Sequence, residues 1–151
     1  MAVAPHWFQG GDCMTTFRQA DSSFWSSQPE FLRPLQALCQ PFGLQIRHFV
    51  MGDPDDPTTP TAAVFKMPPG YVLPRHSHPC ERLEVIIAGS LHAGEDVLVS
   101  GDVMATPAGE MYGPHIAGPD GCTTVEIFSS ITGNGNITFD TEDGPEAVSY
   151  R

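Results

Sequence analysis

Short β-type runs separated by turn signals fill the chain from residue 44 to residue 130, and this alternation constrains the fold more than any other feature. The runs are rich in apolar and β-branched residues, and Gly, Pro and Asp cluster between them without helical patterns. Strands at such regular spacing predict an antiparallel sandwich or barrel. The expected strands are 44–51, 62–67, 71–78, 83–88, 95–99, 102–105 and 123–130.

The N-terminal part of the chain has a different pattern. Residues 1–26 contain several aromatic residues without periodicity, which indicates an arm that packs against another surface. Ser27 and Glu30 then have the capping-box spacing, and apolar residues recur at i, i+4 and i+7 from Phe31. This pattern predicts a short helix that lies on the barrel and ends before Gly43.

One domain is enough for a chain of 151 residues. We divide it into an N-terminal arm and helix, residues 1–43, and a barrel, residues 44–151. The formal net charge of −11, with only seven basic residues, argues against nucleic acid as a partner, because such binding depends on Lys and Arg. The acidic clusters at 53–56 and 140–146 are interpreted as a solvated loop and tail.

The N-terminal sequence MAVAPHWFQGGDC has no basic region followed by an apolar run, so no secretory signal is expected. No apolar stretch approaches the roughly 18 residues that would cross a bilayer. We therefore expect a cytoplasmic protein without a membrane partner. The four cysteines have no CxxC spacing and are expected to be free thiols; they are Cys13, Cys39, Cys80 and Cys122.

Two histidines separated by one residue, His76 and His78, are the main chemical signal. Side chains two apart on a strand point to the same side, so both imidazoles can reach one ion. Neutral imidazole binds Fe, Ni, Cu, Zn and Mn, and two such ligands leave positions for water or substrate. The pair is weak evidence by itself. The other histidines lack such a pattern and are expected to be structural or exposed; they are His6, His48 and His92.

The surroundings of this pair resemble the two-motif signature of the cupin superfamily. The matching positions are Gly70, His76, His78, Gly89, Gly101-Asp102 and Pro107-Ala108-Gly109. The resemblance covers about residues 62–130 and implies an all-β fold, a double-stranded β-helix or jelly roll. In that superfamily the first motif supplies two His and a Glu to a metal, and the second motif supplies another His.

The first motif departs from this pattern, because Arg82 holds the usual Glu position and a guanidinium cannot ligate a cation. Strand parity turns Glu81 away from the Arg82 face, whereas Glu84 shares it. We expect Glu84 inside the barrel, either as a displaced ligand or as the partner of Arg82 in a buried pair that orients the site. Cys80 is a further soft donor, which would favour zinc or copper.

The second motif also departs, because Tyr112 holds the usual His position and His115 follows three residues later. Simple alternation turns His115 outward if Tyr112 faces inward, but Gly113-Pro114 can host a bulge or turn that resets the alternation. Both alternatives stay open: His115 is the third ligand, or Tyr112 is a ligand or a hydroxyl that binds substrate or water.

The resemblance implies a metal-dependent enzyme that acts on a small organic molecule inside the barrel. The predicted metal ligands are His76, His78, His115 and Glu84. The expected cofactor is one divalent transition metal, iron in the first place, with zinc, manganese or nickel as alternatives. Iron implies a dioxygenase-type oxidoreductase, whereas zinc implies an isomerase or cyclase. Tyr112 and Glu84 are the acid–base candidates, and Arg82 would anchor an anionic group.

Other functions stay open on the same residues. An incomplete metal shell also suits a non-catalytic sensor that binds a metabolite or a metal. A metal-free isomerase or epimerase would use His and Tyr as base and acid. The resemblance and the aromatic arm together imply a homodimer.

Overall fold

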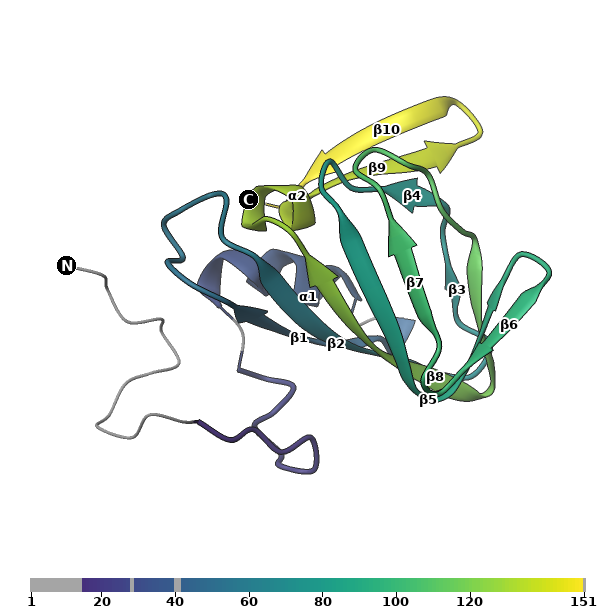
Figure 1. Ribbon diagram of the computed structural model, residues 1–151, viewed down its shortest axis with the longest axis horizontal. Helices are drawn as coiled ribbons and strands as arrows, with labels where there is room; N and C mark the ends of the chain where they lie inside the picture. Colours follow the sequence, from purple (N-terminus) through teal and green to yellow (C-terminus); the bar gives the residue numbers. More distant parts are fainter. Residues whose placement is uncertain (1–14, 28, 40–41, 151) are drawn as a thin grey trace.

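Two antiparallel sheets form the body of the protein in a computed structural model that describes residues 15–27, 29–39 and 42–150 (Figure 1). The larger sheet has the order β1-β2-β8-β5-β6, with β3 paired to β8 and β7 paired to β5; the smaller has the order β10-β9-β4. The strands are β1 (Gln45–Val50), β2 (Thr61–Met67), β3 (Val72–Leu73), β4 (His76–Ser77), β5 (Arg82–Ala93), β6 (Asp96–Val99), β7 (Val103–Thr106), β8 (His115–Phe128), β9 (Asn136–Thr141) and β10 (Gly144–Ser149). The predicted all-β architecture is confirmed.

Three of the expected strands differ most in their limits, and the run 83–88 is only the first half of β5, which extends to Ala93. The run 71–78 divides at Pro74 into β3, which pairs with β8, and β4, which pairs with β9. Proline cannot donate a hydrogen bond to a strand ladder, which accounts for the division. The run 123–130 is the second half of the longer β8, which begins at His115. Gly118, Pro119 and Gly121 lie within this strand.

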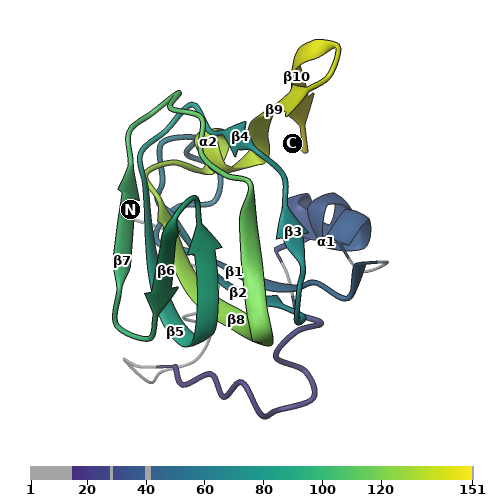
Figure 2. The same cartoon turned by 90° about the vertical axis from the view of Figure 1, so that its right-hand side faces the viewer.

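The C-terminal region is more ordered than the sequence indicated. A short helix, α2 (Ile131–Gly135), is followed by the β9–β10 hairpin, which projects beyond the larger sheet (Figures 1 and 2). The acidic segment 140–146, expected to be a solvated tail, contains the turn of this hairpin. The four acidic side chains of this segment are exposed, as expected, but its backbone belongs to β9, β10 and their turn and is not a free tail.

The N-terminal helix begins later than predicted. A 3₁₀ turn, η1 (Glu30–Leu32), precedes α1 (Arg33–Cys39), and the N-cap is Pro29 without a side-chain cap, so Ser27 does not cap the helix. Of the predicted apolar stripe, Leu35 is buried, whereas the side chains of Phe31 and Leu38 lie outside the described residues. The preceding segment packs on β1, where the Arg47 guanidinium contacts the rings of Phe17, Phe24 and Phe49.

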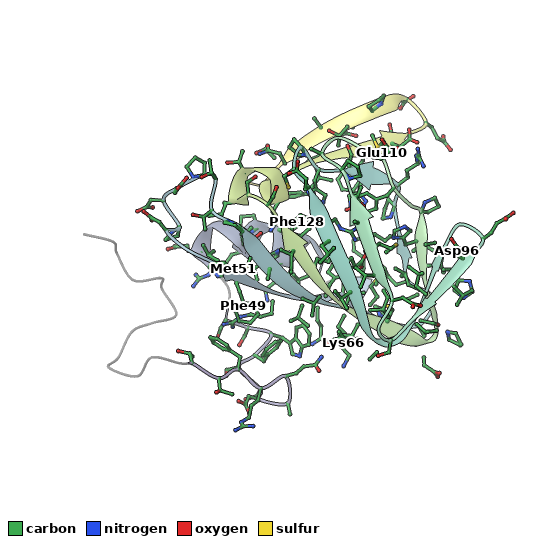
Figure 3. All side chains as sticks on the ribbon, viewed as in Figure 1. Phe49, Met51, Lys66, Asp96, Glu110 and Phe128 are labelled. Carbon is green, nitrogen blue, oxygen red and sulfur yellow. The ribbon has the colours of Figure 1, made fainter. Side chains whose placement is uncertain are left out.

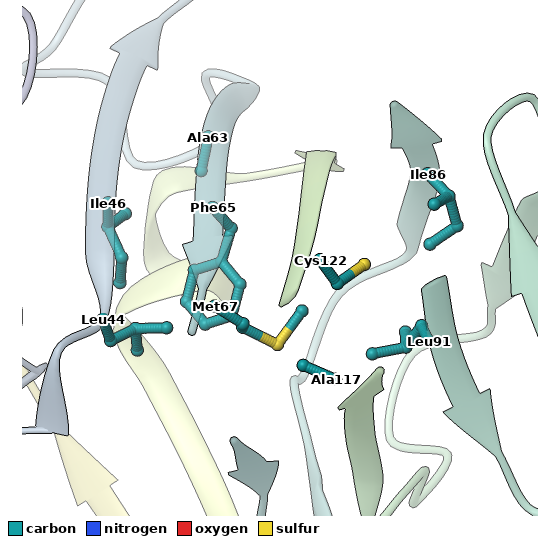
Figure 4. Close-up of a cluster of buried hydrophobic side chains, with 9 residues drawn as sticks. All are labelled: Leu44, Ile46, Ala63, Phe65, Met67, Ile86, Leu91, Ala117 and Cys122. Atoms are coloured by element: carbon teal, nitrogen blue, oxygen red, sulfur yellow. The ribbon is translucent and has the colours of Figure 1, made fainter. Parts of the chain in front are cut away.

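The hydrophobic core lies between the strands of the larger sheet (Figure 4). Its buried members are Leu44, Ile46, Ala63, Phe65, Met67, Ile86, Leu91, Ala117 and Cys122. Those in strands occupy the inward positions, which alternate with outward ones along each strand, as the burial pattern of β2 shows. None of the helices in the described ranges is long and apolar enough to span a membrane.

Candidate functional site

Three histidines, from two segments that are far apart in the sequence, lie in the interior of the barrel. His76 is in β4, His78 follows it, and His115 begins β8; each side chain is about 5% exposed. The ring centroids of His76 and His78 are 5.4 Å apart. The sequence prediction that these two side chains share the inside of the barrel is therefore confirmed as a matter of placement.

Backbone carbonyls fix the orientation of the His76 and His78 rings. Nδ1 of His76 lies 2.6 Å from the carbonyl oxygen of Pro74, and Nδ1 of His78 lies 3.0 Å from that of Gly133 in α2. A carbonyl only accepts, so each Nδ1 carries the proton and each Nε2 of the neutral ring keeps its lone pair. Burial lowers the pKa of His76 to about 4 and also lowers the pKa of His78, so both rings are neutral at pH 7.

Tyr112 and His115 both face the interior, so the alternation is reset between them. Gly113 has a positive φ of 92°, which forms a turn that a simple strand would not make. The Tyr112 hydroxyl donates to Nε2 of His76 over 2.7 Å, and its ring centroid lies 5.6 Å from that of His115. Nδ1 of His115 is buried without a hydrogen-bond partner, and burial lowers the pKa of this ring.

A buried charge cluster joins β5 to β8. Glu84 and Glu126 are direct partners in the β5–β8 ladder, and Arg82 shares the Glu84 side of β5. Nη2 of Arg82 donates to Oε2 of Glu84 and, over 3.1 Å, to Oε1 of Glu126. The predicted inward Arg82–Glu84 pair is thus present, in the arrangement in which Glu84 partners Arg82. Glu126 was not predicted as a site residue. The signal that could have identified it is its position two residues from Thr124 and from Phe128, which also point inward.

The two carboxyl groups of this cluster differ in how readily they ionise. Burial alone would raise the pKa of Glu126, but the Arg82 guanidinium holds it below its ordinary value. Burial and the charge of Glu126 raise the pKa of Glu84. Although burial opposes it, the two carboxylates raise the pKa of Arg82. Glu126 is therefore the ionised partner, and Glu84 is the carboxyl that takes up a proton more readily.

Arg82 also links this cluster to the histidines. Its Cζ atom lies 4.2 Å from the centroid of the Tyr112 ring, close enough for a cation–π interaction. The Tyr112 hydroxyl in turn contacts His76. Burial raises the pKa of Tyr112, so the hydroxyl keeps its proton and acts as a donor. A continuous polar path thus runs from Glu84 through Arg82 and Tyr112 to His76.

A cavity of about 210 Å³ opens beside this path. Most of its lining is apolar, contributed by residues such as Leu35, Ile46 and Phe65. Its imidazole and carboxylate groups are those of His48, His76, His78 and Glu126. His48 was expected to be structural or exposed; it is buried, and burial lowers its pKa to about 4. The exposed His92 agrees with that expectation, and His6 lies outside the described residues.

The donor set meets some requirements of a divalent metal. Metal-bound histidines usually donate the second ring nitrogen to a carbonyl or carboxylate, as His76 and His78 do here. The unpaired Nδ1 of His115 is a third imidazole nitrogen that lacks a partner. In the described ranges, however, no three His, Cys, Asp or Glu side chains form a ready-made ion cluster. Burial raises the pKa of Cys80, so this residue is a thiol and not a thiolate donor.

Comparison with known proteins identifies the fold. No family model matches the sequence, and no curated protein matches it. Among solved structures, the chain is similar to an acetylacetone dioxygenase from Acinetobacter johnsonii, with a TM-score of 0.60 and 13% identity over 94% of this chain and 90% of that one. An RmlC-like cupin from Ralstonia eutropha JMP134 has a TM-score of 0.53 and 18% identity, over 71% and 67% of the two chains. Another from Shewanella frigidimarina NCIMB 400 has a TM-score of 0.52 and 18% identity, over 62% and 81%.

Identities this low establish the fold alone, and the fold is the predicted one. The chain has the cupin jelly-roll fold, with a short N-terminal helix.

Proposed function

We propose that this chain, which has the cupin fold, is a metal-dependent enzyme that acts on a small, uncharged organic molecule in the barrel cavity. The observation that carries the proposal is the shared orientation of His76 and His78. Both give Nδ1 to a backbone carbonyl and keep the Nε2 lone pair, which is the arrangement of imidazoles that ligate an ion. His115, whose Nδ1 is unpaired, is the proposed third ligand.

The cavity supports an uncharged substrate. Glu126 lines the cavity and is ionised, so a carboxylate or phosphate group would meet a like charge there. Arg82 is not among the lining residues, and its charge is already matched by Glu84 and Glu126. The earlier expectation that Arg82 anchors an anionic group is therefore replaced by a role in holding Glu126 and Tyr112. The apolar walls suit an organic body of a few non-hydrogen atoms.

The chain's own residues would position and deprotonate such a substrate. Glu126 faces the cavity as a carboxylate and can accept a proton from a weakly acidic carbon or hydroxyl group. Tyr112 keeps its proton and holds it against His76. A bound divalent metal would supply Lewis acidity and, as iron, open positions for dioxygen. We therefore propose that the protein is a dioxygenase-type oxidoreductase. That Glu84 is a direct metal ligand stays a prediction.

Metal analysis of untagged protein tests the proposal. We expect about one equivalent of a transition metal in the wild type, or after loading with iron, manganese, nickel or zinc. Substitution of His76 or His78 by Ala should abolish this binding, whereas His92→Ala, at an exposed histidine of β5, should not change it. Circular dichroism would show that the fold is retained. A wild type that binds none of these metals would overturn the proposal.

Oxygen consumption separates the proposed enzyme from the other functions. The iron-loaded protein should consume oxygen with one member of a panel of β-diketones, hydroxyketones and catechols, and Glu126→Gln should slow that reaction by about 100-fold or more. Metal binding without any turnover would instead support the sensor function. Turnover that survives exhaustive chelation would support the metal-free isomerase.

A further inference from the structure

The cavity has imidazole groups on two different walls. His76 and His78 come from β4 and the residues after it, whereas His48 comes from the middle of β1 in the larger sheet. The proposed chemistry uses the first two as metal ligands and Glu126 as proton acceptor, and His48 has no part in it. His48 is nevertheless buried, two residues from Ile46 on the inward side of β1, where an apolar side chain is the usual occupant. An imidazole in that place can contact a bound ligand.

Strand register puts His48 and Glu126 on either side of a small residue. His48 pairs with Ala63 across β1 and β2, and Ala63 pairs with Glu126 across β2 and β8. All three side chains are buried. With ~4.8 Å between strands, the Cα atoms of His48 and Glu126 are roughly 10 Å apart, and Ala63 fills the space between them with a methyl group only. We call these three residues the polar notch.

Bulky apolar side chains surround the polar notch. Ile46 and Phe65 pair in the next inward row of β1 and β2, on one side of Ala63 (Figure 4). On the other side is Phe128, two residues beyond Glu126 and labelled in Figure 3. All three apolar side chains line the cavity. The polar notch is therefore a hydrogen-bonding spot in a wall that otherwise suits an apolar body.

Glu126 supplies the acceptor of the polar notch. Its Oε1 receives the Nη2 group of Arg82. The Glu126 side chain is 10% exposed, against 1% for Arg82 and 0% for Glu84, so it is the member of the charge cluster that opens into the cavity. An ionised carboxylate only accepts hydrogen bonds. A ligand group that reaches Glu126 must therefore carry a proton to donate.

His48 supplies the donor. Burial lowers the pKa of His48 and the charge of Glu126 opposes this, so the two side chains interact across Ala63 and the ring is neutral at pH 7. A neutral imidazole has one N–H, and the nearby carboxylate favours the tautomer that turns it toward the notch. A donor and an acceptor that face one point are both satisfied by a hydroxyl group, which accepts from the imidazole and donates to the carboxylate.

We infer that His48 is a substrate-binding residue, and that it recognises a hydroxyl group of the substrate together with Glu126. This inference rests on the proposed function and narrows its substrate class to an uncharged alcohol, phenol or stable enol with an apolar body. A diketone in its keto form has acceptors only and offers no proton to the carboxylate. The hydroxyl group would thus lie against the carboxylate that we propose as the proton acceptor.

Phenol and toluene are matched probes for the polar notch. Apolar cavities of roughly 150 Å³ hold benzene, so a cavity of about 210 Å³ has room for a ring with one substituent. The two probes differ by the exchange of a hydroxyl for a methyl group. Their dissociation constants can be measured by NMR titration of the full chain after exhaustive chelation, so that phenol cannot bind a metal ion. The ratio of the toluene constant to the phenol constant reports the recognition of the hydroxyl group.

Substitutions of His48 should change this ratio. His48→Phe removes the N–H, and we expect the ratio to fall about tenfold, the effect of one lost hydrogen bond. His48→Gln retains an N–H donor and should keep the ratio within about threefold of the wild type. Ile46→Val is the control on the same strand. It removes an apolar contact only, so it should change both constants by a similar factor and leave the ratio as it is.

Filling the polar notch is a second test. Ala63→Val adds two methyl groups between His48 and Glu126, so it should also lower the ratio about tenfold while both polar side chains are kept. Circular dichroism controls for the fold, and Ala63→Val decides the question if His48→Phe does not fold. The inference is overturned if the wild type binds neither probe. It is also overturned if the folded variants keep the wild-type ratio, or if Ile46→Val lowers the ratio as much as they do. Because the titration needs no metal, a chain that binds no metal would overturn the proposed enzyme and leave the result on hydroxyl recognition intact.

Discussion

The hydroxyl of Tyr112 donates to Nε2 of His76 over 2.7 Å, so it holds the nitrogen that a metal ion would need. Tyr112→Phe removes this competitor. Because one such hydrogen bond contributes about 1 kcal/mol net, we expect the affinity for a divalent metal to rise about fivefold, measured by titration against a chelator. A fall in affinity would instead show that Tyr112 is itself a ligand.

His115→Ala tests whether His115 is the third metal ligand. Its ring nitrogen Nδ1 is buried without a hydrogen-bond partner, so we expect the loss of the ring to weaken metal binding by at least about 100-fold while costing little folding stability. The same chelator titration measures the affinity, and urea unfolding of the metal-free protein measures stability. Unchanged affinity would remove His115 from the ligand set.

Removing the cation of the buried charge cluster should lower the free energy of unfolding far more than removing the cation of a surface ion pair. Arg82→Met leaves two carboxylates in the interior without their cation, and we expect it to lower the free energy of unfolding by about 3–5 kcal/mol. The control is Arg75→Met, because the side chains of Arg75 and Asp140 are 47% and 49% exposed and their pair contributes at most about 1 kcal/mol. Equal losses in urea unfolding would contradict this account.

His48 should make the protein less stable in acid. Its pKa is about 4 in the folded chain, against about 6.5 when unfolded, so the unfolded state takes up the proton first as the pH falls. Stability due to the neutral ring is complete above pH 6.5 and is lost toward pH 4, by at most roughly 3 kcal/mol. The measurement is the stability difference between wild type and His48→Gln at several pH values. Glu84, with its raised pKa, acts in the opposite sense but is present in both proteins and cancels.

Two glycines with the same backbone conformation separate strain from close packing. Gly89 and Gly94 have φ angles of 72° and 66°, so alanine at either costs about 1 kcal/mol. A Cβ atom on Gly89 would also overlap the backbone of Gly121, whereas one on Gly94 meets nothing within 4 Å. We expect Gly89→Ala to cost about 2 kcal/mol or more beyond Gly94→Ala in thermal unfolding. Equal costs would show that the chain relaxes around Gly89.

Local patterns in the sequence were sufficient for the barrel strands and for much of the site. Apolar alternation located β1, β2, β5, β6 and β7, and strand parity placed His76, His78, Arg82 and Glu84 inside. Both depend only on neighbours in the sequence. The open question at Tyr112 and His115 was one of parity across a turn, and the structure answers it by turning both inward.

What could not be predicted depends on contacts between distant segments. β9 pairs with both β10 and β4, and nothing in its own sequence, NITFDT, indicates the pairing with β4. His48 lines the cavity because β1 lies beside β2, an arrangement that local patterns do not specify. Glu126 was recognisable by parity, but its role as the second partner of Arg82 follows only from the β5–β8 register.

That register has a consequence for how reliably the chain folds. Glu84 and Glu126 face each other across β5 and β8, and Arg82 reaches both from the same side. If β8 slipped by one residue, Glu126 would turn to the outside and Val125 or Ile127 would replace it, leaving Arg82 without its ionised partner. Misaligned pairings would thus bury an unmatched charge, so the electrostatics of the interior select against these misfolded states and favour a single alignment.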